Sequence, residues 1–402
     1  MGEWKTYRLG NVAEINPKVP IKLGKEYSFI EMKDLEPSRK IVLPSVVKEF
    51  KSGSKFENGD TLFARITPCL ENGKICQAQG LKNGIGFGST EFLVFRGIKN
   101  VSDSDFIYYL TRSEFVRNSA IQAMTGTSGR QRVEKGALEK LEISIPDINE
   151  QQRISSILSS LDDKIELNLQ MNETLEAIAQ GIFKEWFVDF KFPGFDGKLV
   201  DGLPKGWRYD TIGNIGIVVT GKTPSVNNPE HFGDFMPFVT PSDFKSYGKI
   251  IIDSERYLSK EGSIAFSKKI LLKDSVIVTC IGSDMGKVII NKIECVTNQQ
   301  INSIIPNKDV ITTNYLYFIL ANKYEYLRNL ATGGSTMPII NKTQFEQIEI
   351  LLPSITVLRV FQGITNSLSE RVEYNILQNQ TLTQLRDNLL PKLMNGKIKV
   401  TA

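Results

Sequence analysis

The segment of this 402-residue chain that comes closest to an enzyme motif is GIVVTGKT, from Gly216 to Thr223. It has the spacing G-x-x-x-x-G-K-T of a phosphate-binding loop, in which backbone amides and a lysine hold the phosphates of a nucleotide. Here β-branched residues fill the loop, and Pro224 stands where a helix should begin. We therefore expect a turn, and a duplicated nucleotide-binding enzyme is kept only as an alternative.

The other residue types that carry catalysis or bind metal are scarce and scattered. His231 is the only histidine, which leaves little room for histidine-based triads or metal sites. The four cysteines lack C-x-x-C spacing and stand at Cys69, Cys76, Cys280 and Cys295. The sequence thus predicts no catalytic residue, no metal site and no disulfide framework.

The composition is that of an ordinary globular protein, with 41% hydrophobic and 23% charged residues. Forty-nine Lys and Arg against 45 Asp and Glu give a net charge of +4, which permits local binding of nucleic acid without requiring it. No apolar run reaches the roughly eighteen residues of a membrane helix, and the start, MGEWKTYRLG, lacks a signal-peptide core. We expect a cytoplasmic protein with no part in the membrane.

Two matched polar loops are the remaining candidates for chemistry. TGTSGRQR runs from Thr125 to Arg132, and TGGSTMPIIN runs from Thr332 to Asn341. Their glycines and hydroxyls let the backbone approach a ligand closely, and the neighbouring charges suit phosphates and base edges. The alternative is a pair of mobile surface loops, but their recurrence at equivalent places favours DNA.

These loops belong to a tandem duplication with a period near 207 residues. LPKGWRYDTIGNIG echoes EWKTYRLGNVA, and Pro146 and Gly126 correspond to Pro353 and Gly333. Each copy opens with short β-like runs such as DTLFARI and EFLVFRGI, followed by a helical patch, which in the first copy runs from Ser104 to about Thr125. The pattern predicts two α+β globules.

Each globule is followed by a long helical segment. The first runs from Asn149, a candidate N-cap, to about Phe190 without a proline, and would be roughly 60 Å long. Steps of four and three residues predict a coiled-coil seam. Its members are Ile154, Leu158, Leu161, Ile165, Asn168, Asn172, Leu175, Ala179, Ile182 and Trp186, and 207 positions on Phe361, Thr365, Leu368, Val372, Asn375, Asn379, Leu382, Leu389 and Leu393.

Two asparagines recur in both seams. If the helices pair in antiparallel fashion, Asn168 faces Asn379 and Asn172 faces Asn375. A buried asparagine in a seam costs stability and fixes the register. A single asparagine of this kind is more often exposed on an ordinary amphipathic helix, but its recurrence favours pairing. The expected body is globule, rod, globule, rod, with pseudo-two-fold symmetry.

Several segments resemble the specificity subunit of type I restriction-modification systems, over essentially the whole chain. They are LPKGWRYDTIGNIG, GDFMPFVTPSDF, TGGSTMPIINKTQFEQIEILLP, EQQRISSILSSLDDKIELN, IFKEWFVDF and LRDNLLPKLMNGKI. The resemblance implies two tandem α+β target-recognition domains, at 1–148 and 198–354. They would alternate with two long conserved helices, at 149–197 and 355–402, that form an antiparallel coiled coil.

The same resemblance implies a non-catalytic DNA-binding chain. Each domain would read one half of a bipartite site in double-stranded DNA, and the coiled coil would set the gap. Two modification subunits would bind S-adenosylmethionine and methylate a flipped adenine, and two restriction subunits would complete the nuclease. This chain would bind no cofactor itself. A methyltransferase-only or related restriction system is an alternative setting.

For the DNA contacts, the resemblance points to residues of the two matched loops. They are Thr127, Ser128, Arg130 and Arg132 in the first domain, and Ser335, Thr336, Asn341 and Lys342 in the second. The first loop departs from the family pattern, since it lacks the TMP of the second. Apolar residues outside the seam, with Phe183 and Phe187 favoured, are expected to dock the helices of the modification subunits.

Overall fold

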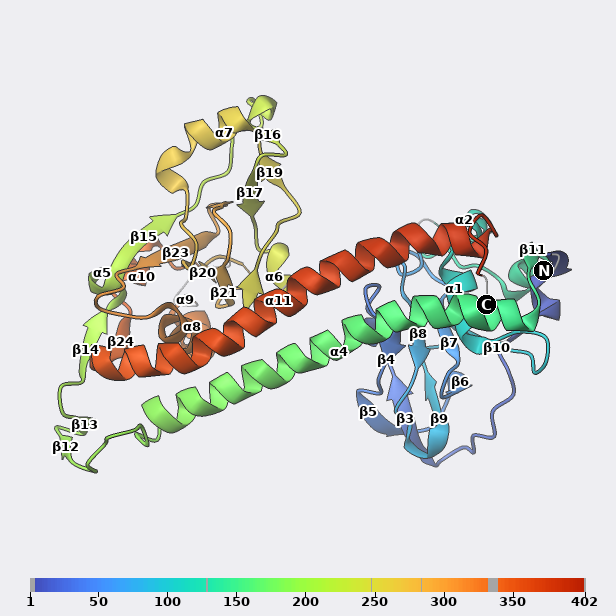
Figure 1. Cartoon of the computed structure of the whole chain (residues 1–402), viewed down its shortest axis with the longest axis horizontal. Helices are drawn as coiled ribbons and strands as arrows, with labels where there is room; N and C mark the ends of the chain where they lie inside the picture. The colour runs from blue at the N-terminus through green and yellow to red at the C-terminus, as the bar shows by residue number, and fades with distance from the viewer. Residues whose placement is uncertain (1–3, 128, 247, 283, 332–338, 401–402) are drawn as a thin grey trace. The chain divides into compact units, whose positions relative to one another are not determined.

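The computed structural model describes residues 4–400 except 128, 247, 283 and 332–338. The chain forms two compact units, unit 1 with residues 1–170 and 376–402, and unit 2 with residues 171–375. Each unit contains one β-rich globular domain and a part of each of the two long helices that are drawn in green and red in Figure 1.

Unit 1 is built on two larger sheets and one strand pair. A five-stranded sheet has the order β2-β10-β7-β8-β4, a four-stranded sheet has the order β5-β3-β9-β6, and β1 pairs with β11. The strands are β1 (Lys5–Arg8), β2 (Ala13–Ile15), β3 (Glu26–Ile30), β4 (Ile41–Val42), β5 (Val46–Glu49), β6 (Ser54–Glu57), β7 (Thr61–Ala64), β8 (Ile75–Ala78), β9 (Ile85–Gly88), β10 (Phe92–Gly97) and β11 (Glu142–Ile145).

Uninterrupted apolar runs make the central strands of unit 1, since β7 and β8 are buried along their whole length. The helical patch expected from Ser104 to Thr125 is two helices, α1 (Ser104–Arg112) and α2 (Glu114–Gln122). They are separated at Ser113, whose backbone is extended and whose hydroxyl accepts a hydrogen bond from an amide of α2. A short helix, α3 (Lys135–Glu139), then leads into β11.

Unit 2 repeats this plan. Its five-stranded sheet has the order β15-β23-β20-β21-β18, its four-stranded sheet β16-β19-β17-β22, and β14 pairs with β24. The elements are β14 (Arg208–Thr211), α5 (Ile212–Ile215), β15 (Gly216–Thr220), β16 (Phe232–Gly233), β17 (Met236–Val239), α6 (Asp243–Ser246), β18 (Ile250–Ile251), β19 (Tyr257–Leu258), α7 (Lys260–Ala265), β20 (Val276–Thr279), β21 (Val288–Asn291), β22 (Val296–Thr297), β23 (Ile301–Pro306), α8 (Thr313–Ala321), α9 (Tyr324–Ala331), α10 (Lys342–Glu346) and β24 (Glu349–Leu352).

The two five-stranded sheets place equivalent strands in the same order, and each has one parallel pair at its edge, β4 with β8 and β18 with β21. Two different sequences therefore fold to one topology within a single chain. The predicted α+β class, with two β-rich domains each followed by a long helix, is confirmed. A small hairpin, β12 (Leu199–Val200) and β13 (Leu203–Pro204), precedes the second domain.

The long helices are α4 (Ile148–Phe187) and α11 (Ile355–Met394), each of 40 residues. The expected cap Asn149 is wrong, because the Asp147 carboxylate accepts the amides of residues 149 and 150 at the start of α4. At 1.5 Å per residue each helix is roughly 60 Å long. Helices of this length depend on packing against other elements for most of their stability.

Within each unit α4 and α11 pack together in antiparallel fashion through asparagines. In unit 1 the Asn168 amide donates to the Asn379 side chain over 2.8 Å, and in unit 2 the Asn375 amide donates to Asn172 over 2.8 Å. Asn168 and Asn375 are fully buried, and the side-chain oxygen of each has no hydrogen-bond partner among the described residues. Each buried amide group thus has a hydrogen bond at its nitrogen but none at its oxygen, which costs stability. The pairing also distinguishes this alignment of the two helices from alignments shifted along the helix axis.

Two aromatic side chains expected to dock partner helices are buried instead. Phe183 and Phe187, near the end of α4, are 1% and 3% exposed. The Phe187 ring lies 4.6 Å from the ring of Tyr315 on α8 and 4.9 Å from that of Phe361 on α11. Burying such a side chain stabilises a fold by about 1.5–3 kcal/mol. The expectation of partner docking was wrong for this pair, because the second domain covers it.

The asparagine pairing yields a stability prediction. Replacing Asn168 and Asn379 together by isoleucine should raise the free energy of unfolding by about 1–2 kcal/mol, because a half-satisfied buried amide becomes apolar contact. The single change Asn379→Ile should lower it, since Asn168 keeps its amide and loses an acceptor. Chemical denaturation with size-exclusion chromatography measures both. Unchanged stability and assembly in the double variant would contradict the register.

Candidate nucleic-acid interface

The loop between α2 and α3 in unit 1 is a turn whose two ends are joined by backbone hydrogen bonds. Thr125 and Arg132 exchange two backbone hydrogen bonds of 3.0 and 2.9 Å, and the Arg130 amide donates to the Thr127 carbonyl over 3.0 Å. Gly126 and Gly129 have φ of +125° and +79°, values that favour glycine, so the turn needs both. Of the described residues at the tip of the turn, Thr127, Gly129 and Arg130 are exposed.

The predicted residues of this turn fall into two groups. Thr127 and Arg130 are exposed, and Arg130 forms no side-chain ion pair with a described residue. Arg132 is engaged: its Nε and Nη2 donate to the Glu91 carboxylate over 2.7–3.0 Å. These hydrogen bonds, together with charge attraction, raise the pKa of Arg132 above its ordinary value. Ser128 lies outside the described residues.

Arg132 fastens the turn to the domain. Its backbone forms an isolated bridge with Ile66, and the next amide, that of Val133, donates to the carbonyl of Arg65. Glu91 precedes β10, so the Arg132 side chain joins the turn to a strand of the main sheet. This position therefore sets the shape of the turn and leaves Arg130 as its free cation among the described residues.

In unit 2 the corresponding loop is described only from residue 339 onward, so Ser335 and Thr336 lie outside the described residues. Asn341 caps α10, since its Oδ1 accepts the Gln344 amide over 2.9 Å and its own amide donates to the Gln344 side chain. Lys342 forms an ion pair of 3.4 Å with Glu346 one turn along the helix. Both side chains are exposed, but each already has a partner in its own chain.

Ile339 in unit 2 takes the place that Arg132 has in unit 1. It forms the isolated bridge with Ile281, as Arg132 does with Ile66. An apolar residue thus replaces an arginine at the base of an equivalent loop. The two loops share a backbone anchor and differ in the side chains they present.

The string GIVVTGKT is not a phosphate loop, and the turn expected there was wrong, because most of the string is a strand. Residues Gly216–Thr220 form β15, which pairs with β23 along its whole length. A Cβ atom on Gly221 would lie 2.1 Å from the carbonyl oxygen of Asn298, so that glycine serves close strand packing. The helix that a nucleotide site needs after the lysine does not form, since the chain continues without regular structure to residue 228. The nucleotide-binding alternative is therefore wrong.

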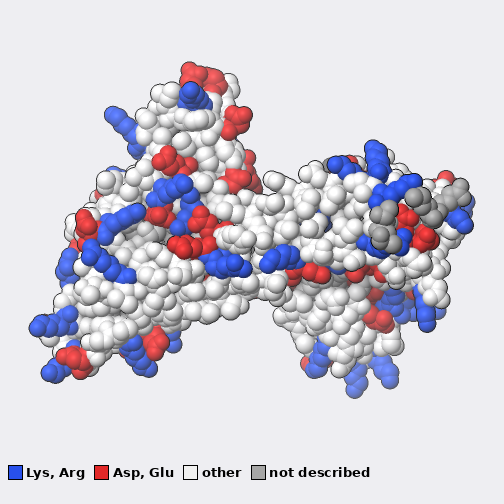
Figure 2. All heavy atoms as spheres, viewed as in Figure 1, with Lys and Arg blue, Asp and Glu red and all other residues white. Residues whose placement is uncertain are grey.

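Charge is mixed on the surface. Lys and Arg side chains are interspersed with Asp and Glu on the face drawn in Figure 2. Among the described residues, no group of three or more His, Cys, Asp and Glu could hold a metal ion. Within the same residues, none of the helices has the length and apolarity to span a membrane.

Comparison with known proteins identifies the family. A model of the type I restriction modification DNA specificity domain matches residues 1–177 and 204–381, which are the two repeats. The chain belongs to this family. The HindI type I restriction enzyme specificity subunit of Haemophilus influenzae is 31% identical over 466 residues, covering 99% of this chain and 100% of that protein. The chain is therefore the non-catalytic DNA specificity subunit of a type I restriction-modification system.

Two further relatives agree with this assignment. The MjaIX specificity subunit of Methanocaldococcus jannaschii is 26% identical over 308 residues, covering 74% of this chain and 69% of that protein. The crystal structure of the S subunit from M. genitalium matches with a TM-score of 0.58 at 16% identity, over 98% of this chain and 96% of that one. At that identity the structural likeness concerns the fold alone.

The contacts that hold the turn between α2 and α3 were not predicted from the sequence. Glu91 and Glu134 hold Arg132 and Arg65 in ion pairs of 2.7 Å each, and the Thr67 amide donates to the Gln131 carbonyl. The signal was present only as a polar stretch, ARITPCLENGK, around Arg65. Nothing in the spacing shows that this stretch lies beside a loop some sixty residues later in the chain.

Substitutions of the two arginines of the turn should have different effects on DNA binding. Arg130→Ala should weaken DNA binding and reduce its salt dependence by about one phosphate contact, without changing the melting temperature. Arg132→Ala and Glu91→Ala should have similar effects on DNA affinity and on the melting temperature, because either substitution breaks the ion pair that holds the turn to the sheet. Titration of fluorescent duplexes at several salt concentrations, paired with thermal melts, measures these effects.

A matched control is Lys99→Ala, which removes an exposed charge from another loop of the same domain. It should leave both measurements near the parent values. If Glu91→Ala keeps full affinity while Arg132→Ala loses it, Arg132 is a DNA contact and its assignment as a fastening residue is wrong.

Proposed function

We propose that each globular domain of this specificity subunit reads one half of a bipartite DNA sequence. The duplication carries this proposal, because the chain presents two equivalent anchored loops that carry different side chains. Base-edge contacts from the two loops would supply specificity, and Lys and Arg contacts to phosphates would supply affinity. Two unlike domains imply an asymmetric site.

The paired helices would set the gap between the two halves. Each helix is roughly 60 Å long, enough to separate two reading surfaces by about one turn of DNA, some 34 Å centre to centre. The buried asparagines support a single register of the helices. A fixed register would give a fixed gap.

We further propose that two modification subunits dock on the long helices. Two exposed apolar residues of α4, Ile157 and Ile178, recur 207 positions later on α11 as Ile364 and Leu385, and all four are 36–47% exposed. Each unit thus carries one member of the pair Ile157 and Ile364 and one member of the pair Ile178 and Leu385. A surface that occurs once in each unit suits two copies of one partner. Unpaired apolar positions on a helix are suited to packing against further helices.

The catalytic chemistry would then belong to the partners. The modification subunits would hold S-adenosylmethionine and methylate an adenine flipped out of the duplex. Two restriction subunits would join the complex to cut unmodified DNA. Because its target is DNA, we place the complex in the cytoplasm. A methyltransferase-only system would use this chain in the same way, without the restriction subunits.

The direct test is to co-express this chain with the modification gene beside it and sequence the methylated bases of the host DNA. We expect methyl-adenine at a single motif made of two short half-sites separated by a gap of fixed length. A control chain with Asn149→Ala, an exposed helix residue, should give the same motif. A soluble, assembled complex that adds no methylation would refute the proposed function.

The docking proposal predicts a change in stoichiometry. Ile157→Arg should leave one modification subunit on the chain, and Ile157→Arg with Ile364→Arg should leave none, because a charge is placed in an apolar contact. Native mass spectrometry of the purified complex measures the copies bound. Leu23→Arg, an exposed loop position, is the matched control. Two bound partners in the double variant would count against these positions.

A further inference from the structure

Two buried lysines occupy the same place in the two domains. Lys40 is 7% exposed and directly precedes β4, and Lys249 is 3% exposed and directly precedes β18. The carbonyl of each accepts an amide of the neighbouring strand, from Gln77 in unit 1 over 2.7 Å and from Ile290 in unit 2 over 2.8 Å. The two lysines therefore occupy equivalent positions, each at the start of the edge strand of its five-stranded sheet.

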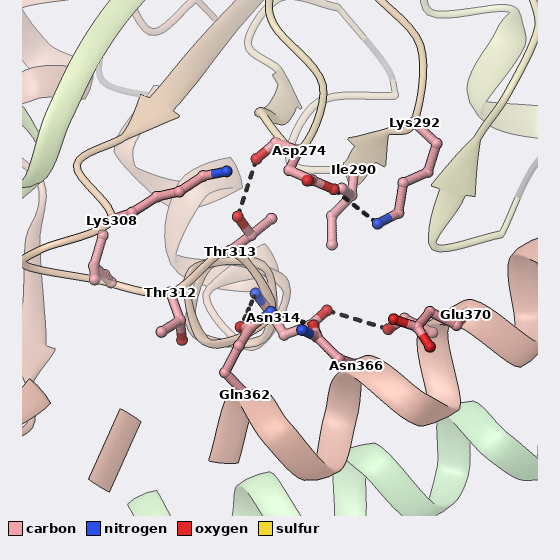
Figure 3. A pocket seen from close by; sticks show the side chains of 12 residues that line it. Asp274, Ile290, Lys292, Lys308, Thr312, Thr313, Asn314, Gln362, Asn366 and Glu370 are labelled. Atoms are coloured by element: carbon pink, nitrogen blue, oxygen red, sulfur yellow. Dashed lines mark hydrogen bonds and ion pairs between the residues drawn. The ribbon is translucent and has the colours of Figure 1, made fainter. Parts of the chain in front are cut away.

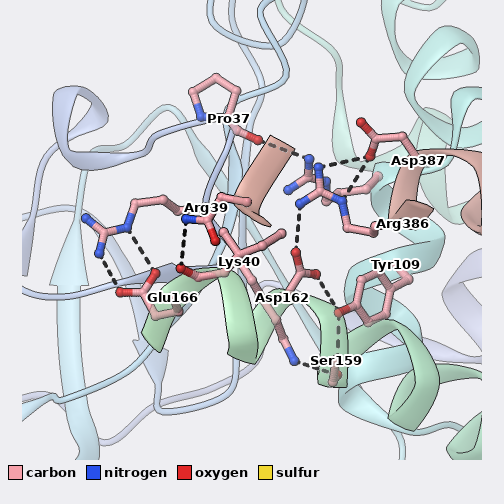
Figure 4. A network of polar contacts seen from close by, with 12 residues as sticks. Pro37, Arg39, Lys40, Tyr109, Ser159, Asp162, Glu166, Arg386 and Asp387 are labelled. Atoms are coloured by element: carbon pink, nitrogen blue, oxygen red, sulfur yellow. Dashed lines mark hydrogen bonds and ion pairs between the residues drawn. The ribbon is translucent and has the colours of Figure 1, made fainter. Parts of the chain in front are cut away.

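In unit 1 the lysine connects the sheet to a long helix. The Nζ of Lys40 donates to the Ser159 hydroxyl on α4 over 2.8 Å and lies 3.0 Å from the Asp105 carboxylate on α1. The same Nζ lies 5.9 Å from the ring centroid of Tyr108 and 5.6 Å from that of Tyr109. Figure 4 shows Lys40 and Ser159 beside the Asp162–Arg386 ion pair of the two long helices.

In unit 2 the same arrangement recurs with other partners. The Nζ of Lys249 donates to the Ser369 hydroxyl on α11 over 3.2 Å and lies 4.6 and 5.1 Å from the ring centroids of Phe318 and Tyr317 on α8. Its backbone amide donates to the Glu176 carboxylate on α4 over 3.3 Å. Lysine, aromatic pair and helix serine are therefore present in both domains.

The serines are not equivalent in the duplication, although the lysines are. On the long helices, where the repeat distance is 207 residues, Ser369 corresponds to Asp162 and Ser159 corresponds to Asn366, so the two contacts lie about one helical turn apart. The acceptor has thus changed its position while the lysine and the aromatic pair have kept theirs. What both domains retain is the lysine that joins sheet to helix.

Polar side chains line part of the contact between domain and helices near these lysines. In unit 2 a pocket of about 370 Å³ lies between the start of α8 and α11, and Figure 3 shows the polar side chains that line it. There Asn314 donates to Asn366 over 3.1 Å and, through its backbone, to Gln362 over 3.3 Å. In unit 1 a pocket of about 220 Å³ beside β4 is lined by Arg39 and by Glu166 of α4, which pair with each other.

A buried lysine is costly at such a place. Burial lowers the pKa of Lys249 to about 8, so the protein pays to keep the ammonium charged there. An apolar side chain of the same length would fill the space without that cost, and replacing buried charges in this way is often neutral or stabilising. Stability is therefore a poor explanation for the lysine, whereas a directional contact is a good one.

We propose that Lys40 and Lys249 are positioning residues that fix the orientation of each DNA-reading domain on the paired helices, and thereby the gap length that the complex accepts. The inference rests on the proposed bipartite readout. Each lysine bridges the edge strand and a long helix beside a pocket lined partly by polar side chains, so its loss would let the domain tilt. A tilting domain reaches half-sites at more than one spacing.

The test uses the complex assembled with its modification subunits and duplexes carrying the motif found by methylation sequencing. Binding is measured for the natural gap and for gaps one base pair longer and shorter, and their ratio gives the discrimination. We expect Lys40→Met and Lys249→Met each to lower this ratio by about tenfold, or about 1.4 kcal/mol. The melting temperature of the Lys249→Met complex should be unchanged or higher.

Second variants and controls separate positioning from folding. Ser159→Ala and Ser369→Ala remove the acceptors and keep the lysines, and should lower the ratio in the same direction. Lys99→Met and Lys205→Met each remove an exposed lysine, one per unit, and should keep the parent ratio. A folded Lys249→Met complex with the parent ratio overturns the inference. A parent complex without any gap preference overturns the proposed bipartite readout as well.

Discussion

The structure depends on how two long helices meet through polar residues. Asn168 and Asn375 are fully buried in the contact between α4 and α11, and in unit 1 the Asp162 and Arg386 ion pair, 2% and 4% exposed, lies in the same contact. Such groups are tolerable only where their partners stand opposite, so most other registers would leave a buried amide or charge unpaired. The helices therefore have one alignment, and the domains are attached to it.

Each domain is attached through its own set of polar contacts. In unit 1 the Tyr109 hydroxyl donates to Asp162 over 2.6 Å, and the buried phenol has a pKa above its usual range because of burial and the nearby carboxylate. In unit 2 the residue equivalent to Asp162 is Ser369, which meets Lys249. One topology is thus held on one kind of helix pair by two different networks. Different recognition surfaces can be carried on the same framework without changing the framework.

Much of this plan can be read from the repeat. The asparagines at a separation of 207 residues predicted which helix positions meet, because a duplication shows the same constraint twice. Phe183 and Phe187 were misjudged because helical periodicity cannot show that a distant domain covers a helix end. In the sequence Arg132 and Asn341 look like polar groups free to bind DNA. In the structure Arg132 forms an ion pair with Glu91, and Asn341 caps the first turn of α10. Lys40 and Lys249 share only a short Lys-Ile pattern in segments that otherwise diverge, so only the structure shows that they are equivalent.

The central claim is that each domain reads its own half-site while the helix pair holds the gap. Exchanging residues 1–148 for the corresponding domain of a relative, with both long helices kept, tests it most directly when the methylated motif is sequenced again. We expect one half of the motif to change while the other half and the gap stay the same. A folded, active chimera in which both halves or the gap length change would contradict it.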